Sequence, residues 1–591
     1  MITMKKWIKK ALIAALLLGA VLGNVRTSLA ATYYVSLAGD NVNSGAQESP
    51  WRTIQYAAGR VTAGDTVRVS SGTYNENVTI SADGNSANWI NFIASSNNGP
   101  VIVRKFSFSG ANYVRIKGFE ITHVDTAYGQ GITFSGSCGH IEILDNYIHN
   151  TRFEAIQTLA GSIPHYITIR GNRIDYPGNP GTLAPSMAAI AGVFVTPHKI
   201  LIEYNHVTRM MDFCDMYGTN VIVRNNSAYW VDTGLWTSLG HPDMFQPGSD
   251  GFAVGTRHHV YERNWTGFTT NSHSHFGIWQ DTVDAGDTNQ LIRGNVAANI
   301  GGGGIGNIGT DKMSIYNNSF FNMCHVADGA GLYVAYRYAT VGSTLANNII
   351  QNDNSGSDAI SIDSSSQILN THNWGYQAGS ESSYRGTSDP LFNSIGVATL
   401  DMRLQAGSPC RGIGTDLVRI TSAAGSGTSF VVNDSQLLCD GFDIVEGDVI
   451  MVGSTRTRIT DIDWSANRVT VANSVSWTQN TPVYWGDRGD QRDLGAYPHG
   501  AMLLTAATMQ RSGSTYTVTP TGDARGVWFY VDDIPTIWDY EAPFTANIPS
   551  GTVTAKAYAL YAQRIPVVDA ISGPGGGGTP PAAPTGVRIE L

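Results

Sequence analysis

The chain repeats one short pattern of hydrophobic and polar positions through its middle. Two apolar residues alternate with polar ones, two spacers follow, and an asparagine comes next, as in IEILDNYI at 141–148 and ITIRGNRI at 167–174. Alternation with a period of two is typical of a β-strand, and asparagine tolerates the left-handed backbone of a tight turn. We therefore predict a strand and then a turn in each copy. The asparagines are Asn146, Asn172, Asn205, Asn226, Asn264, Asn295, Asn318 and Asn348, at intervals of 21 to 38 residues.

A second short strand is expected upstream of most copies. Its second position is Ile, Val, Leu or Met every time, so this position should face the core, and the first and third positions should face outward. Fixed strand and turn units at irregular intervals predict a parallel β-solenoid with short turns on one side and variable loops on the other. The second strands begin at Gly131, Ala155, Gly192, Asp215, Asp243, Gly277, Gly304, Gly331 and Ala359.

The remaining segments have other patterns. Residues 1–30 combine four lysines with a short apolar run, which predicts a cleaved secretory signal and an exported protein without membrane insertion. The solenoid should span 31–413, with 491–499 as a candidate closing segment. Residues 414–490 read as a small inserted β-barrel-like domain that caps the solenoid end, and 502–570 as a β-sandwich. The Gly/Pro-rich stretch 571–591 reads as a linker or tail.

Composition supports an all-β protein. The 591 residues include 66 glycines and only 14% charged residues, and the net charge of -10 argues against nucleic acid as a partner. Five scattered cysteines signal neither a zinc site nor a disulfide framework, and the only disulfide we consider joins Cys410 and Cys439. We expect a monomer without an organic cofactor.

These repeats, with the stretch TYYVSLAGDNVNSGAQESPWRTIQYAAGRVTAGDTVRVSSGTYNENVTI from Thr32, resemble the right-handed parallel β-helix proteins of the pectate-lyase-like superfamily. The resemblance covers residues 32 to 410. It implies a secreted protein that acts on a polysaccharide in a cleft along the second strands and their flanking loops. Residues 502–570 are similar to bacterial immunoglobulin-like modules.

Polar residues form two columns when the second strands are aligned. Asp215 and Asp243 should lie on adjacent coils with carboxylates about 5 Å apart, because neighbouring strands are ~4.8 Å apart. His241 and His275 form the second column, two residues earlier. Such close carboxylates need a cation, a shared proton or a histidinium, so Asp215 and Asp243 are candidate Ca²⁺ ligands. Asp281 is a third candidate, because it is one of three spaced aspartates in the loop TVDAGDTN.

Aromatic residues occupy the third position of four consecutive second strands. A sugar ring could lie across them, or they could simply stabilise the surface as a ladder. Arg257 and His258, in a neighbouring loop, are further candidates for binding substrate, Arg257 through a bidentate contact with a carboxylate. The aromatic residues are Phe194, Tyr217, Phe245 and Trp279, with Tyr333 further along.

Three functions remain open from the sequence. A polysaccharide lyase would use His241 or His275 as base, with Arg257 or bound Ca²⁺ neutralising a uronate carboxylate, and we favour it narrowly because the N-terminal stretch resembles secreted lyases. A glycoside hydrolase would use Asp215 and Asp243 as paired carboxylates. A non-catalytic glycan-binding or adhesion protein would use the aromatic column alone.

Overall fold

The computed structural model describes most of the chain from Ala30 to residue 572. The described ranges are 30–95, 99–122, 129–175, 188–192, 199–209, 212–216, 218–229, 243–245, 257–268, 275–278, 288–308, 311–323, 334–336, 340–351, 359–376, 382–396, 399–488 and 492–572. Nearly all regular structure is β, and the exceptions are the short helix α2 (Ile54–Ala58) and two 3-10 turns, η2 (Ser435–Leu437) and η3 (Gly486–Arg488).

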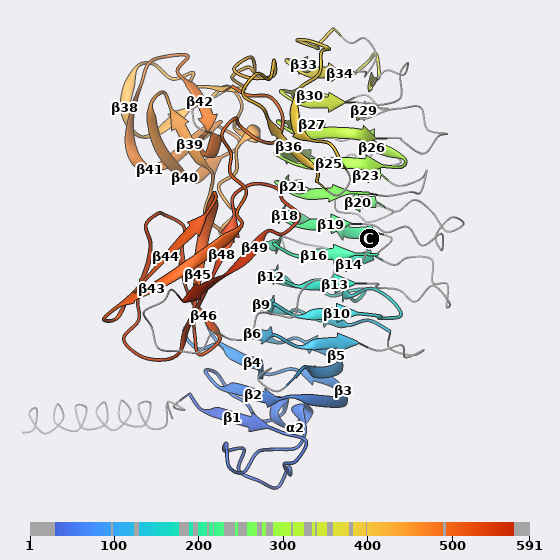
Figure 1. The fold of residues 1–591 in the computed structure, drawn as a ribbon, viewed down its shortest axis with the longest axis vertical. Helices are drawn as coiled ribbons and strands as arrows, with labels where there is room; N and C mark the ends of the chain where they lie inside the picture. The colour runs from blue at the N-terminus through green and yellow to red at the C-terminus, as the bar shows by residue number, and fades with distance from the viewer. Residues whose placement is uncertain are drawn as a thin grey trace, which may run out of the picture.

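Parallel strands stack into a long solenoid, shown upright in Figure 1. A 13-stranded sheet forms one side, and a 21-stranded sheet wraps round the rest as a middle row and a third row joined through the long strands β3 (Gly72–Ile80) and β5 (Val101–Ser109). The predicted all-β parallel solenoid is therefore confirmed. The third row contains nine strands, as many as the second strands expected from the sequence.

The 13-stranded sheet consists of β1 (Thr32–Val35), β2 (Thr66–Ser70), β4 (Ile90–Ser95), β6 (Asn112–Lys117), β9 (Gly139–Leu144), β12 (His165–Arg170), β15 (Ile200–Glu203), β18 (Thr219–Arg224), β21 (Arg257–Glu262), β24 (Thr288–Arg293), β27 (Asp311–Tyr316), β30 (Val341–Ala346) and β33 (Gln367–Thr371). The middle row consists of β7 (Glu120–Thr122), β10 (Tyr147–His149), β13 (Arg173–Asp175), β16 (His206–Thr208), β19 (Ser227–Tyr229), β22 (Trp265–Gly267), β25 (Val296–Ile300), β28 (Ser319–Met323), β31 (Ile349–Gln351) and β34 (Trp374–Tyr376). The third row consists of β8 (Ile132–Ser135), β11 (Ile156–Thr158), β14 (Ala188–Gly192), β17 (Asp212–Met216), β20 (Asp243–Phe245), β23 (His275–Ile278), β26 (Gly303–Ile308), β29 (Val334–Tyr336) and β32 (Ile360–Ile362).

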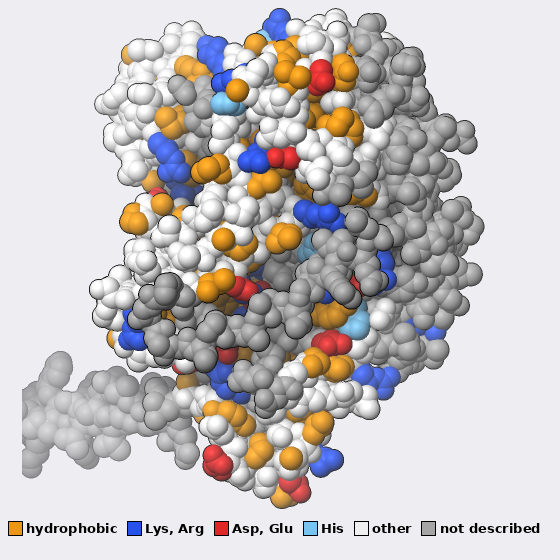
Figure 2. All heavy atoms as spheres, viewed as in Figure 1, with side chains coloured by type: hydrophobic (Ala, Val, Ile, Leu, Met, Phe, Trp, Pro, Cys, Tyr) orange, Lys and Arg blue, Asp and Glu red, His pale blue; other side chains and the backbone are white. Residues whose placement is uncertain are grey.

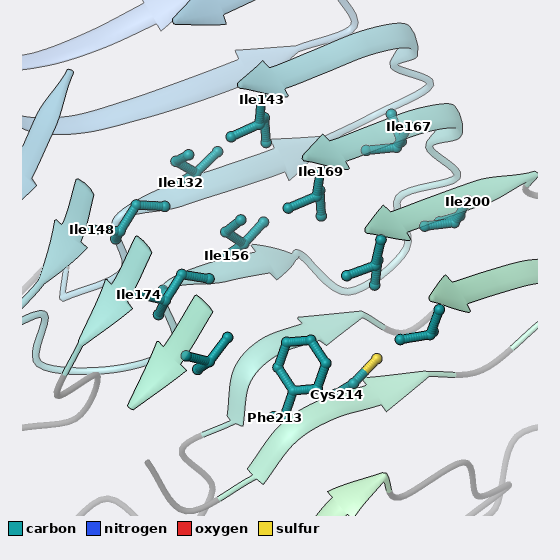
Figure 3. Close-up of a cluster of buried hydrophobic side chains, with 14 of the residues drawn as sticks. Ile132, Ile143, Ile148, Ile156, Ile167, Ile169, Ile174, Ile200, Phe213 and Cys214 are labelled. Atoms are coloured by element: carbon teal, nitrogen blue, oxygen red, sulfur yellow. The ribbon is translucent and has the colours of Figure 1, made fainter. Parts of the chain in front are cut away.

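Inward-facing aliphatic side chains fill the space between the rows. Figure 3 shows isoleucines from all three rows converging, and Phe213 and Cys214 of β17 continue this core into the next coils. Within part of a column the same residue type recurs from coil to coil, as in Ile141, Ile167 and Ile200 of the 13-stranded sheet. Apolar burial of this kind is the main favourable term in folding the solenoid.

The repeated asparagines form a continuous buried ladder. From Asn172 onward, the Oδ1 of each asparagine accepts two hydrogen bonds from the asparagine one coil earlier, from its backbone N–H and from its Nδ2, at 2.9–3.1 Å throughout. Asn373 adds a ninth member at the C-terminal end. The ladder satisfies the polar groups of a turn that would otherwise be buried without partners.

The left-handed residue of each turn is not the ladder asparagine itself, contrary to our expectation. The residue immediately before it has positive φ, between 52° and 69°, at positions such as Asp145, Tyr204 and Arg263. Because that backbone turn points the following side chain inward, the asparagine can reach its neighbours along the solenoid axis.

Two further antiparallel-rich sheets follow the solenoid. β35 (Phe392–Ser394) and β36 (Asp401–Leu404) form a hairpin before them. The six-stranded sheet contains β37 (Val418–Arg419), β38 (Gly425–Val431), β39 (Val449–Val452), β40 (Thr455–Asp463), β41 (Arg468–Trp477) and β42 (Pro482–Trp485). The seven-stranded sheet contains β43 (Ala506–Ser512), β44 (Thr515–Thr521), β45 (Ala524–Val531), β46 (Ile534–Asp539), β47 (Phe544–Asn547), β48 (Val553–Ala559) and β49 (Val567–Ser572). The immunoglobulin-like assignment of the last sheet and the domain boundaries stay predictions.

Both sheets pack against the flank of the solenoid, not over its end as we expected for the insertion. In Figure 1 they lie beside the 13-stranded sheet, drawn in orange and red. Outward-facing Leu201, Ile222 and Val260 of that sheet share one apolar cluster with the six-stranded sheet. The Tyr204 hydroxyl donates to the backbone carbonyl of Ala559 at 3.2 Å. The outer face of the 13-stranded sheet is thus an internal interface.

Buried ion pairs cross this interface. Arg293 binds Glu262 on the solenoid and Asp448 of the six-stranded sheet, both at 2.6 Å. Arg525 of the seven-stranded sheet lies 3.2 Å from Glu446 and 3.6 Å from Glu262. Breaking such a pair from one side leaves an uncompensated buried charge, which is strongly destabilising. The network therefore fixes how the two sheets sit on the solenoid.

The described cysteines form no disulfide bond. Cys138, Cys214, Cys410 and Cys439 are free and buried, so the disulfide between Cys410 and Cys439 does not form. These two cysteines belong to different apolar clusters, which explains why they do not meet.

On the face shown in Figure 2, lysine and arginine side chains are scattered and form no broad basic patch. No helix in the described part of the chain has the length and apolar character needed to cross a bilayer.

We predict that Asn264→Ala lowers the free energy of unfolding by about 2–6 kcal/mol, because two buried donors of Asn226 lose their acceptor at about 1–3 kcal/mol each. Denaturant unfolding measures the loss. Asn393→Ala, at an exposed position outside the ladder, is the control and should change stability little. Equal effects of the two substitutions would contradict the role of the ladder.

Replacing Arg293 by Met should cost about 3–5 kcal/mol, because Glu262 and Asp448 then stay buried without their shared partner. Arg68→Met is the matched control, since its partner Asp533 is half exposed and a surface pair contributes about 0–1 kcal/mol. Thermal unfolding of both variants would decide. An Arg293→Met protein as stable as the Arg68→Met protein would rule out a stabilising interface network.

Candidate functional site

The third row carries the ionisable residues that the sequence singled out, but in a different register. Cys214 of β17 pairs with Phe245 of β20, so Asp243 lies opposite Asp212 and not opposite Asp215. Asp215 pairs with Ala191 of β14 and is offset from Asp243 by three residues, or about 10 Å along the strands. The predicted Asp215–Asp243 pair is therefore wrong.

Asp212 and Asp243 make direct contact. The backbone N–H of Asp243 donates to the Oδ1 of Asp212 at 2.8 Å. Asp243 is fully buried, and Asp212 is 6% exposed. Two acidic residues on adjacent coils, both withdrawn from water, are costly to bury and mark a candidate functional site.

His275 follows in the same column. It pairs with Asp243 across β20 and β23, whereas we expected it to pair with His241. The backbone register therefore reads Ala188, Asp212, Asp243, His275 and Gly303 over five coils. We call Asp212, Asp243 and His275 the acid–histidine column.

Phe245 belongs to the core and not to an exposed aromatic platform. It has no exposed surface, and its ring lies 4.7 Å from Tyr261 and 5.3 Å from Phe276. Met244 is buried in the same core. Asp243, Met244 and Phe245 are all fully buried, so the strict alternation of inward and outward side chains that we assumed does not hold in β20.

Arg257 and His258 are not part of the acid–histidine column. Both lie on β21 of the 13-stranded sheet, where Arg257 pairs with Thr219 and Thr288. The His258 ring lies 5.1 Å from Trp464 of the six-stranded sheet, so His258 faces the internal interface and its prediction as a substrate-binding residue is wrong. The other predicted residues, His241, Phe194, Tyr217, Trp279, Tyr333 and Asp281, lie outside the described residues.

The described residues do not make a calcium site. No three His, Cys, Asp or Glu side chains among them are grouped to hold a metal ion. Asp212 and Asp243 offer four carboxylate oxygens, one of which already accepts an N–H, whereas Ca²⁺ takes six to eight oxygen ligands. Calcium binding by this protein stays a prediction.

Sequence reasoning missed Glu154 and underrated Asp212. Glu154 comes two residues before Ile156 of β11, and Asp212 comes two residues before Cys214, at the equivalent position of its coil. Both residues could have been identified as acidic residues that lie two positions before the core residue of a third-row strand. This pattern can be recognised in the sequence only when the core residue of each strand is known.

Comparison with known proteins agrees with this fold. Residues 33–170 match the family model described as a Pel9A-like, right-handed β-helix region. This part of the chain is thus similar to the right-handed β-helix region of Pel9A-like proteins. The resemblance seen in the repeats and the N-terminal stretch is thereby confirmed for the fold.

More distant matches add little about activity. An uncharacterized protein of Bacillus subtilis (strain 168), YwoF, is 31% identical over 138 residues, which is 21% of this chain and 29% of that protein. Among solved structures, pectate lyase Pel9A is 15% identical, with 67% of this chain and 94% of that chain covered and a TM-score of 0.40. The GH136 lacto-N-biosidase of Eubacterium ramulus is 12% identical in its native form, with 57% and 68% covered and a TM-score of 0.36. Such scores transfer no residue role.

Phe245→Ala should destabilise the protein by about 3–5 kcal/mol, because it leaves a cavity in the solenoid core. Tyr540→Ala is the control: this exposed aromatic follows β46, the Arg458 guanidinium lies 4.4 Å from its ring, and its loss should change stability by about 1 kcal/mol or less. Denaturant unfolding measures both. If the Phe245→Ala protein had unchanged stability but bound glycan more weakly, Phe245 would have to be an exposed substrate-binding residue after all.

Proposed function

We propose that this protein is a secreted polysaccharide-cleaving enzyme that hydrolyses glycosidic bonds at the acid–histidine column. The observation that carries the proposal is the buried contact between Asp212 and Asp243 on adjacent coils. The Pel9A-like match over residues 33–170 and the signal-like N-terminus support an exported protein that works on a polysaccharide.

Hydrolysis needs an ionised carboxylate that activates water or attacks the sugar. Asp212 suits this role because the N–H of Asp243 stabilises negative charge on its Oδ1. Asp243, which is fully buried, acts as a positioning residue: its backbone holds the Asp212 carboxylate in one orientation.

Elimination is the second candidate reaction, and the register of His275 beside Asp243 favours it. A lyase would use the His275 imidazole as the base that removes the proton next to a uronate carboxylate. A lyase would also need a positive charge to neutralise that carboxylate. We place hydrolysis first because the contact between Asp212 and Asp243 is a feature that paired carboxylates would use. The lyase favoured from the sequence thus becomes the alternative.

The test is a digest of acidic and neutral polysaccharides that follows reducing ends and unsaturated-uronate absorbance together. We expect reducing ends to rise without the absorbance. Asp212→Asn should lower kcat by about 100-fold or more, the size of a general acid–base contribution. Asp215→Asn, three residues along the same strand, is the matched control and should retain activity.

Other results would change the assignment. Absorbance that rises with reducing ends would replace hydrolysis by elimination and move the base to His275. Glycan binding without any cleavage would make the protein a binding module and overturn the proposal. An Asp215→Asn variant that loses as much activity as Asp212→Asn would contradict the assignment to Asp212.

A further inference from the structure

Glu154 has a buried carboxyl group without a counter-charge. The residue is 6% exposed, and among the described residues its carboxyl takes part in no ion pair and in no hydrogen bond to another side chain. Burial raises the pKa of Glu154 to about 6, and its own backbone N–H opposes that shift only in part. Below that pH the group holds a proton.

The other deeply buried glutamates of the solenoid are compensated. Burial of Glu203 is outweighed by Arg224 and Arg170, which hold its pKa at about 2. Arg293 acts in the same direction on the pKa of Glu262. Glu154 therefore does not belong to the structural ion-pair network, and burying it serves no evident purpose in folding.

The backbone places Glu154 at the same end of the third row as Asp212. Ile156 pairs with Ile190, and Ile190 pairs with Cys214, so β11 and β17 are two coils apart. The carbonyl of Glu154 accepts from the N–H of Gly131 at 3.3 Å, so Glu154 is hydrogen-bonded to the preceding coil just before β11 begins. Two coil spacings of ~4.8 Å put the Glu154 and Asp212 positions about 10 Å apart.

We propose that Glu154 is the proton donor of the hydrolytic site and that the enzyme inverts the configuration of the sugar it cleaves. This inference rests on the proposed function. Inverting glycosidases separate their two carboxyl groups by about 6.5–9.5 Å, which leaves room for the attacking water, whereas retaining enzymes need about 5–5.5 Å. The spacing of Glu154 and Asp212 suits the first arrangement once their side chains lean toward the bond.

The reaction balances with these two residues and water. Asp212 removes a proton from water as the water oxygen bonds to the anomeric carbon. The bond from that carbon to the glycosidic oxygen breaks, its electron pair stays on the leaving oxygen, and that oxygen takes the proton of Glu154. Solvent then returns a proton to Glu154 and removes one from Asp212.

Few charged groups lie near Glu154 in the described structure. Arg152 is on the same loop, Gln130 and Lys105 are one and two coils earlier and contact each other at 3.3 Å, and Asp212 is two coils later. Burial, and no charged neighbour, sets the direction of the Glu154 pKa shift. The protonated form should therefore persist to about pH 6 over a range of ionic strengths.

The experiment compares the wild-type enzyme with Glu154→Gln and with Glu120→Gln, a control on the middle row. Glu154→Gln should lower kcat by about 100-fold or more with little change in KM, and Glu120→Gln should retain activity. The wild-type kcat should fall on the alkaline side with a pKa near 6, and the residual activity of Glu154→Gln should lack this limb. The first product, followed by NMR, should have inverted configuration.

Stability gives a readout that does not depend on activity. The folded pKa of about 6 lies above the ordinary value of 4.5, so the wild-type protein loses stability as pH rises through this interval. Glu154→Gln cannot ionise and should melt higher than the wild type at pH 7 to 8 but not at pH 4. A Glu154→Gln protein that melts at a lower temperature than the wild type at pH 7 would contradict the claim that the Glu154 carboxyl is buried without a compensating charge.

The outcomes separate this inference from the proposed function. A wild-type enzyme that hydrolyses a polysaccharide while Glu154→Gln is equally active overturns the role of Glu154 and leaves the proposed function standing. Retention of configuration overturns the pairing of Glu154 with Asp212. A wild-type protein that cleaves nothing overturns both.

Discussion

The asparagine ladder is the constraint on which the rest of the structure depends. It joins nine coils through paired hydrogen bonds at one turn of each coil. The strand that follows this turn therefore begins at a fixed position along the solenoid axis in every coil. The rows then pair in parallel without long gaps. The number of residues between the ladder asparagine and the third-row strand of each coil then determines which side chains lie side by side in the third row. The candidate site is thus a consequence of loop length as much as of residue type.

The fold could be predicted from the sequence because its signals are local. The apolar alternation and the asparagine sit within eight residues of each other, and Ile132, Ile156, Ile305 and Ile360 occupy the core column as expected. The register failed in the coils between them. Cys214 and Phe245 take the core positions that we assigned to Met216 and Met244, because strict alternation does not hold in β20 and the connections differ in length.

Buried charge is handled in two ways in this chain. At the flank, Arg293, Glu262 and Asp448 neutralise one another across an interface between segments that lie more than 150 residues apart in the sequence. No local sequence pattern predicts that Asp448 is a partner of Arg293. In the third row, Glu154 stays uncompensated among the described residues, and the Asp212 carboxylate accepts a hydrogen bond from the backbone of Asp243. The contrast between the two regions separates charges that serve the fold from those that are available for chemistry.

The most direct measurement of the central claim is the register of β17 against β20. In a Cys214→Ala background, Asp212→Cys with Asp243→Cys should form a disulfide on mild oxidation, because neighbouring parallel strands bring the two Cα atoms to about 5 Å, within the range that a disulfide spans. Asp215→Cys with Asp243→Cys, offset by three residues, should not. Peptide mapping identifies the bond. A disulfide between positions 215 and 243 and none between 212 and 243 would contradict the register and, with it, the acid–histidine column.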